Sequence, residues 1–137
     1  MGRYINPETA GKERTQLTRA VVLALRQLML QTEANELTRD LAAFIALTLE
    51  SIDHTIDASV VAWEKRGYWV KADQFRLEWS WAGMLGAKMR QAVLNEDWMS
   101  VAQLSAQVAQ KLTTVKLPQR HGLGEPWGGA YARLTAK

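Results

Sequence analysis

Apolar residues recur at intervals of three and four along most of the chain, which is the spacing of one face of an α-helix. The longest such series predicts a helix from about residue 37 to about residue 67. Its apolar positions are Leu37, Leu41, Ile45, Thr48, Ile52, Ile56, Val60 and Trp63. Gly67 suits the left-handed position that follows a helix, so we expect this helix to end there.

Three more helices are predicted around this one, over about residues 7–31, 69–94 and 95–117. Asn6 precedes a proline and an acid, the usual order at a helix start, so we expect it to be an N-cap. Asn95 precedes two acids and is the expected N-cap of the last helix. The connections are short, which favours antiparallel neighbours.

The helix predicted over residues 69–94 has two apolar stripes. One holds Val70, Leu77, Trp81, Met84 and Leu85, and the other holds Phe75, Trp79, Ala82, Gly86, Met89 and Val93. At about 100° per residue the stripes lie over a third of a turn apart, so this helix is predicted to be central or to serve two interfaces. Gly83 and Gly86 weaken a helix interior, and we expect another helix backbone to approach them closely.

Four of the six tryptophans lie between residues 63 and 81. Trp79 and Trp81 are two residues apart, a spacing that does not share a helix face, so their environments should differ. We expect Trp81 in the core of one chain and Trp79 at a contact between helices or subunits. The pattern alone leaves open which of the two stripes faces inward.

Residues 118–137 change in character, with four glycines and two prolines that predict an irregular arm. Trp127, Tyr131 and Leu134 are unusual in a disordered tail, so the arm should pack on the bundle or on a partner subunit. The sequence therefore predicts an all-α fold, with an up-and-down four-helix bundle in residues 1–117 and a Gly/Pro-rich arm in residues 118–137.

The composition is that of an ordinary globular protein, with 47% hydrophobic and 23% charged residues in 137. Cysteine is absent, which excludes disulfides and thiolate chemistry. There is no signal-peptide core and no uncharged apolar run long enough to cross a bilayer. We expect a cytoplasmic protein of bacterial type that has no membrane partner.

The net charge is only +3, but the charges are unevenly distributed. Acids dominate residues 33–64, while bases dominate the N-terminal segment and residues 111–137. Such segments can steer a partner, or they can face each other within the fold or across a dimer. We favour the second interpretation. The basic termini also suggest weak nucleic-acid binding, although no helix has a dense Lys/Arg row and no recognition helix can be placed.

One constellation could bind a metal ion. Glu50, Asp53, His54 and Asp57 share a face of the helix over residues 37–67, and carboxylates with an imidazole can hold a divalent cation in a bundle. Such a site could bind a small ligand or act hydrolytically. A di-iron centre would need Glu-x-x-His pairs on two helices, which the chain lacks. A solvated polar face is the commoner explanation.

The glycine-rich segment over residues 122–129 is the only other motif of interest. Phosphate-binding glycine loops usually follow a strand, and none is predicted before this one. Glu125 would also repel a phosphate. The segment is therefore interpreted as a set of turns.

The favoured hypothesis is a non-enzymatic helical interaction or scaffold protein that forms a homodimer and needs no cofactor. A C2 dimer is the commonest assembly of this kind. The expected interface residues are Trp69, Phe75, Trp79, Trp81, Gly83, Gly86, Trp127 and Tyr131. The alternatives are a metal- or small-ligand-binding bundle and a weak nucleic-acid binder.

Overall fold

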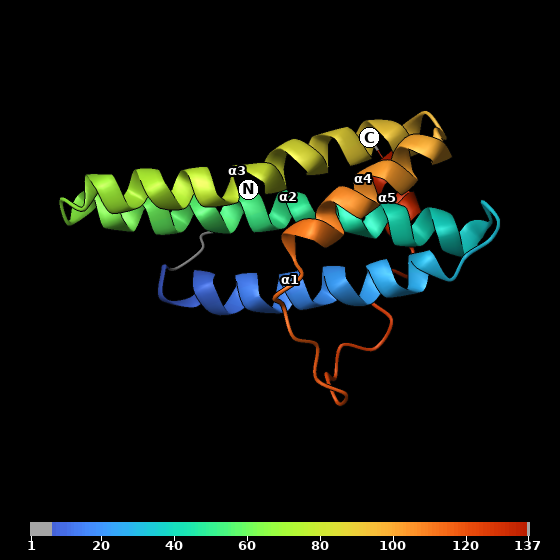
Figure 1. Cartoon of the computed structure of the whole chain (residues 1–137), viewed down its shortest axis with the longest axis horizontal. Helices are drawn as coiled ribbons and strands as arrows, with labels where there is room; N and C mark the ends of the chain where they lie inside the picture. The colour runs from blue at the N-terminus through green and yellow to red at the C-terminus, as the bar shows by residue number, and fades with distance from the viewer. Residues whose placement is uncertain (1–6, 137) are drawn as a thin grey trace.

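The computed structural model describes residues 7–136, and within that range the fold is all-α, as predicted. The helices are α1 (Pro7–Met29), α2 (Glu36–Lys65), α3 (Trp69–Leu94), α4 (Trp98–Lys111) and α5 (Ala130–Thr135). The three long helices lie in layers, with α2 between α1 and α3, and α4 crosses them obliquely (Figure 1). No helix in the described range is long and apolar enough to cross a membrane.

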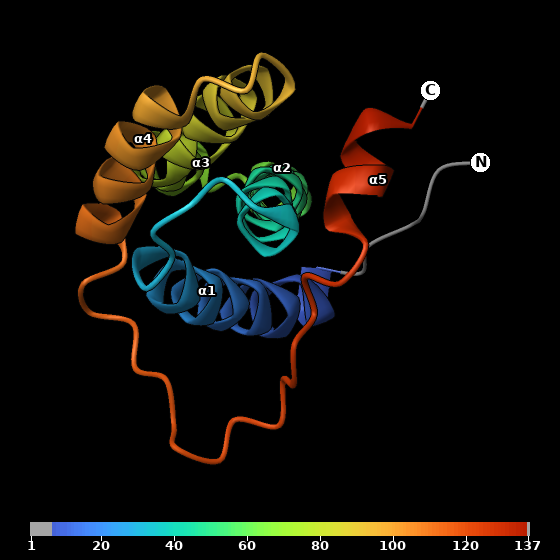
Figure 2. The ribbon, with the colours of Figure 1, turned by 90° about the vertical axis from the view of Figure 1, so that its right-hand side faces the viewer.

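The centre of the bundle is α2, which packs against α1, α3 and α5, while α4 lies against α3 and α1 (Figure 2). Six consecutive α2 residues, 41–46, are buried, so this stretch faces the core on every side. A helix that is apolar all round belongs inside a bundle. The central position considered for residues 69–94 is therefore taken by α2, and α3 keeps one side open to solvent.

The α2–α3 pair packs closely where α3 carries glycine. A Cβ added to Gly86 would lie 3.1 Å from the Leu49 Cβ and 3.5 Å from the Ala46 carbonyl oxygen. A Cβ on Gly83 would lie 2.8 Å from the carboxyl carbon of Asp53. The expected close approach of a helix backbone is thus observed at Gly86. Both glycines face α2 of their own chain.

The turn between α2 and α3 has the geometry that the sequence predicts. Gly67 has a φ of +81°, and its N–H donates to the Glu64 carbonyl at 3.0 Å. The Tyr68 N–H donates to the Trp63 carbonyl at 2.9 Å. This pair of bonds defines a Schellman motif, in which the left-handed residue satisfies the last carbonyls of the helix.

The turn between α3 and α4 differs from the prediction. Asn95 caps the C-terminus of α3, and Glu96 adopts the left-handed conformation with a φ of 51°. The N-cap of α4 is Asp97, whose carboxylate accepts from the Ser100 N–H at 3.2 Å. The prediction of Asn95 as N-cap was wrong, because Asn95 ends α3 and the helix α4 begins two residues later than predicted, with Asp97 as its N-cap. Asn6, the other predicted N-cap, lies outside the described residues.

The C-terminal segment also departs from the prediction. The helix α4 ends at Lys111 rather than near residue 117, and the β-branched pair Thr113 and Thr114 follows. The chain then passes around α1 and returns on the opposite side of α2 as α5 (Figure 2). The arm thus includes a short helix and lies against its own bundle.

Candidate interaction site

The outward side of α3 carries a line of exposed apolar side chains, here called the outer face of α3. It consists of Val70, Leu77 and Met84, which are 71%, 76% and 56% exposed. They are spaced seven residues apart, and that spacing keeps side chains on nearly the same side of a helix. This face belongs to the stripe that we expected to include the core residue Trp81, so the two stripes are assigned in reverse.

The inward stripe of α3 is the other one. Ala82, Gly86, Met89 and Val93 are buried, and Phe75 and Trp79 are half-buried against α2. Leu85 is the exception in the outward stripe, since it is buried as well. The glycines explain the choice, because only the side of α3 that carries Gly86 can approach α2 at this distance.

The turn that joins α2 to α3 continues the apolar surface. Val61, Tyr68 and Trp69 are all exposed there, with Trp69 at 60%. This end of the α2–α3 pair extends beyond the start of α1 (Figure 1). Of the predicted interface residues, Trp69 is therefore the one that the fold leaves exposed.

The remaining aromatic residues of this region form a ladder of rings, composed of Trp63, Phe75, Trp79 and Trp81. Successive ring centres lie 4.7, 6.4 and 5.9 Å apart. Trp79 and Trp81 stack with 25° between their planes and are both half-buried. The expectation of separate environments for these two was wrong, because indole side chains are long enough to meet although their Cα atoms lie on different sides of the helix.

Arg14 of α1 lies against this ladder. Its guanidinium carbon is 4.8 Å from the centre of the Phe75 ring and 5.7 Å from that of Trp79. Its nitrogens donate to the hydroxyls of Thr55 and Ser59 at 3.3–3.4 Å. Burial lowers the pKa of Arg14, and the charge of Glu78 opposes that shift. This cation therefore joins α1 to α2 and α3 and has a structural place inside the fold.

The acidic and histidine face of α2 does not assemble into a metal site. Glu50 accepts two hydrogen bonds from Arg90, each 2.7 Å long, and they raise the pKa of the guanidinium. Asp53 lies against Gly83, while His54 and Asp57 point to solvent. Within residues 7–136, no three acidic or histidine side chains could together hold a metal ion. The metal-centre hypothesis thus lacks support from the geometry.

The arm is attached to its own chain through α2. Trp127 is only 6% exposed and belongs to the main core. The Asp40 carboxylate accepts from the Tyr131 N–H at 2.9 Å and from the Gly129 N–H at 3.3 Å. Trp127 and Tyr131 therefore both make contacts within their own chain.

Two acidic residues of α2 form ion pairs with arginines of α3. These arginines lie outside the basic ends of the chain, so the ion pairs do not show the expected facing of acidic and basic segments. Arg90 binds Glu50, and Arg76 binds Glu64 at 3.3 Å. One further acid–base pair, Glu96 with Arg39, joins the start of α2 to the turn before α4 at 2.9 Å.

Comparisons of this chain with protein-family models, with curated proteins and with solved structures find no match. The candidate site therefore depends on the geometry above. The spacing of Val70, Leu77 and Met84 predicts a shared stripe but does not show that the stripe is exposed. The signal that could have found them is their strict spacing of seven, without a glycine among them.

Proposed function

We propose that this protein is a non-enzymatic interaction protein that self-associates through the outer face of α3. The observation that supports the proposal is the line of three large apolar side chains at 56–76% exposure. Scattered apolar residues on a surface are ordinary, but an aligned series on one helix is the pattern by which helices pair.

The outer face of α3 suits an antiparallel contact with the same face of a second copy. At 1.5 Å per residue, Val70 and Met84 lie about 21 Å apart, long enough for several turns of helix to pair. A two-fold axis at Leu77 would place Val70 of each copy near Met84 of the other. A contact of this kind is self-complementary, as a C2 dimer requires.

The charges beside Leu77 fit the same arrangement. Arg76 and Glu78 flank it, and an antiparallel pair would bring Arg76 of one copy opposite Glu78 of the other. Glu78 is exposed and interacts with Arg14 through its charge alone, without a salt bridge in the described part of the chain. Arg76 already pairs with Glu64 and Asp73 and would have to share its charge with Glu78 of the second copy. Such flanking pairs set the orientation of paired helices more than they add affinity.

Sedimentation velocity tests this proposal. The protein concentration should span roughly 1–100 µM, the order of magnitude in which a small interface dissociates. We expect a monomer–dimer equilibrium that Leu77→Arg weakens at least about tenfold, because the change places a charge at the centre of the contact. Leu77 is 76% exposed, so the helical circular dichroism should stay unchanged.

The matched control is Gln107→Arg, which adds the same charge at an exposed position of α4. It should leave the equilibrium as it is. A wild-type chain that stays monomeric at the highest concentration contradicts the proposal. So does a dimer that Leu77→Arg does not weaken.

The two alternative functions receive less support from the geometry. Glu50 is bound to Arg90, which removes one ligand from the metal hypothesis. Arg14, one of the bases that suggested nucleic-acid binding, is half-buried beside Phe75 and Trp79.

A further inference from the structure

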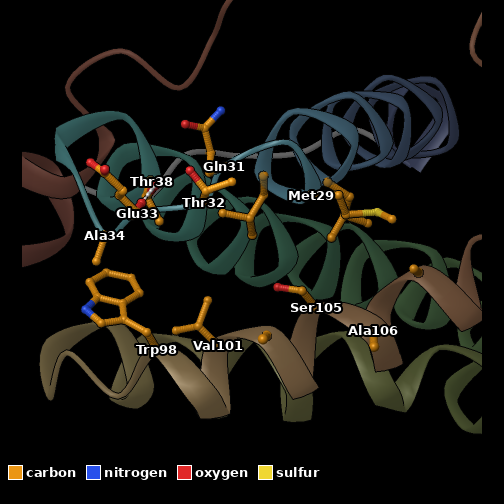
Figure 3. A pocket seen from close by; sticks show the side chains of 14 residues that line it. Met29, Gln31, Thr32, Glu33, Ala34, Thr38, Trp98, Val101, Ser105 and Ala106 are labelled. Atoms are coloured by element: carbon orange, nitrogen blue, oxygen red, sulfur yellow. Dashed lines mark hydrogen bonds between the residues drawn. The ribbon is translucent and has the colours of Figure 1, made fainter.

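A pocket lies on a different side of the bundle, between the C-terminal part of α1, the loop that follows it and α4 (Figure 3). Its volume is about 570 Å³, within the range of small-molecule sites. Leu25, Leu28 and Met29 line it from α1, and Trp98 and Val101 line it from α4. Nothing in the sequence pattern predicts a pocket at this place.

The pocket exists because α4 presents small side chains toward α1. Ala102, Ala106 and Ala109 line its α4 side, spaced four and three residues apart on one helix face. Methyl groups are too short to fill the space to α1. Met29, Ala102 and Ala106 are exposed, so the pocket opens to solvent on one side and a molecule can enter it.

One polar group inside this pocket lacks a partner. The Ser105 side chain is 8% exposed, and its hydroxyl oxygen has no hydrogen-bond partner, the one such buried side-chain atom in residues 7–136. Figure 3 shows Ser105 projecting from α4 toward α1, among the residues that line the pocket. Buried hydroxyls are nearly always hydrogen-bonded, so an unpaired one in the wall of a pocket needs a partner. The oxygen itself is covered, so a bound molecule reaches it when the side chains beside it shift.

The charge of the lining restricts what could bind. Glu33 in the loop is the only charged residue that lines the pocket, and no lysine, arginine or histidine does so. A carboxylate, sulfonate or phosphate would therefore meet no cation and one like charge. The other polar lining groups, Gln31, Thr32 and Thr38, lie at the loop end of the pocket (Figure 3).

We propose that this pocket binds a single uncharged, mostly apolar molecule that carries a hydrogen-bond donor for the Ser105 hydroxyl. The leucines, Met29 and the alanines of α4 would surround its apolar body. The Ser105 hydroxyl would accept a hydrogen bond from the molecule's donor at the inner end of the pocket. This site shares no residue with the outer face of α3, so it is independent of the proposed self-association.

Two fluorescent probes that differ in one charged group test the ligand class. N-phenyl-1-naphthylamine is neutral and has one N–H donor, and 1-anilinonaphthalene-8-sulfonate adds a sulfonate to the same rings. We expect the neutral probe to bind saturably at one site per chain, and the sulfonate to bind at least about tenfold more weakly. Equal or tighter binding of the sulfonate overturns the charge argument.

Two substitutions test the position of the site. Ala106→Phe fills the pocket and should weaken binding of the neutral probe at least about tenfold, whereas Ala132→Phe, the same change at an exposed position of α5, should not affect it. Ser105→Ala should weaken binding about threefold to tenfold, the effect of one hydrogen bond, while it leaves or raises the melting temperature of the free protein.

Unchanged probe binding in Ala106→Phe overturns the proposal. If that variant does not fold, the amide spectrum of the ¹⁵N-labelled wild-type chain decides. Probe-induced shifts at Ala102, Ser105 and Ala106 support the site. Shifts confined to the outer face of α3 show that the probe binds there instead and overturn it.

Discussion

Contacts with α3 change the pKa of a carboxyl group on α2. The Asp53 carboxylate lies over the backbone of Gly83, where a side chain would have displaced it. Burial there raises its pKa, as does the nearby charge of Asp57, and His54 opposes the shift. Asp53 is therefore a carboxylate whose charged form the fold disfavours.

The sign of this pKa shift predicts a pH-dependent effect of Asp53→Asn. Since an aspartate in an unfolded chain titrates near about 3.9, the unfolded chain loses the proton first as pH rises. The free energy of unfolding therefore falls as pH rises from the pKa of Asp53 in the unfolded chain to its higher pKa in the folded chain. Above both pKa values it stays at the lower level. Asp53→Asn should be more stable than wild type at pH 7, and this gain should vanish at pH values below about 3.9.

Urea denaturation of both proteins across that pH range measures the effect. Asp73→Asn is the control, because Asp73 is exposed and paired with Arg76. It should show no gain at pH 7. A gain in Asp53→Asn that persists unchanged at acid pH would assign the effect to packing and not to charge.

At the scale of the element, α3 shows how one helix serves two environments. The side of α3 that carries Gly86 faces α2, because the missing side chain allows the two helices to pack closely. The outer side of α3 keeps large apolar residues exposed. The ladder of rings lies between these sides, and Trp79 contacts both apolar clusters of the fold.

Trp79→Ala should therefore destabilise the chain more than Trp81→Ala. Trp79 stacks on Trp81, contacts the Phe75 ring at a tilt of 48° and lies beside Arg14. Trp81 has the single ring contact with Trp79. We expect a loss of about 3 kcal/mol for Trp79→Ala, toward the lower end for large aromatic deletions because the ring is only half-buried. Equilibrium unfolding in urea compares the two variants, and an equal or larger loss in Trp81→Ala would contradict the assignment.

At the scale of the whole molecule, the arm fastens the bundle to itself. The segment after α4 crosses the outside of α1 and brings α5 to the far side of α2 (Figure 2). The N-cap residue of α5, Gly129, has no side chain that could cap the helix. The carboxylate of Asp40 in α2 caps it instead, by accepting from the N–H groups of Gly129 and Tyr131. A single acid thus anchors the C-terminal segment to the central helix.

Asp40→Ala should release α5 and leave the four longer helices folded. The loss of a cap costs about 1 kcal/mol, so local opening at Tyr131 should increase about fivefold. Amide hydrogen exchange at Tyr131, compared with exchange at Leu49 in the centre of α2, measures this. Asp57→Ala, an exposed acid on the same helix, is the control, and equal exchange at Tyr131 in both variants would exclude Asp40 as the anchor.

The amino-acid sequence by itself determined the features that depend on neighbouring residues. The spacing of apolar positions predicted α2 and α3 almost to their ends, and Gly67 marked the turn between them. These features are local, because a helix and its cap are formed by residues within a few positions of one another. The same reasoning failed between α3 and α4, where Asn95 and Asp97 are both good N-cap residues and lie only two positions apart.

Only the tertiary structure decided how these helices use their faces. Nothing local distinguishes the stripe of Leu77 from that of Trp79, because both are apolar at helical spacing. The choice depends on the fit of Gly86 against Ala46 and Leu49, which lie some 40 residues earlier in the chain. The anchoring of the arm by Asp40 and the unfilled space around Ser105 have the same origin. Each arises from contacts between segments far apart in sequence, which the local pattern does not encode.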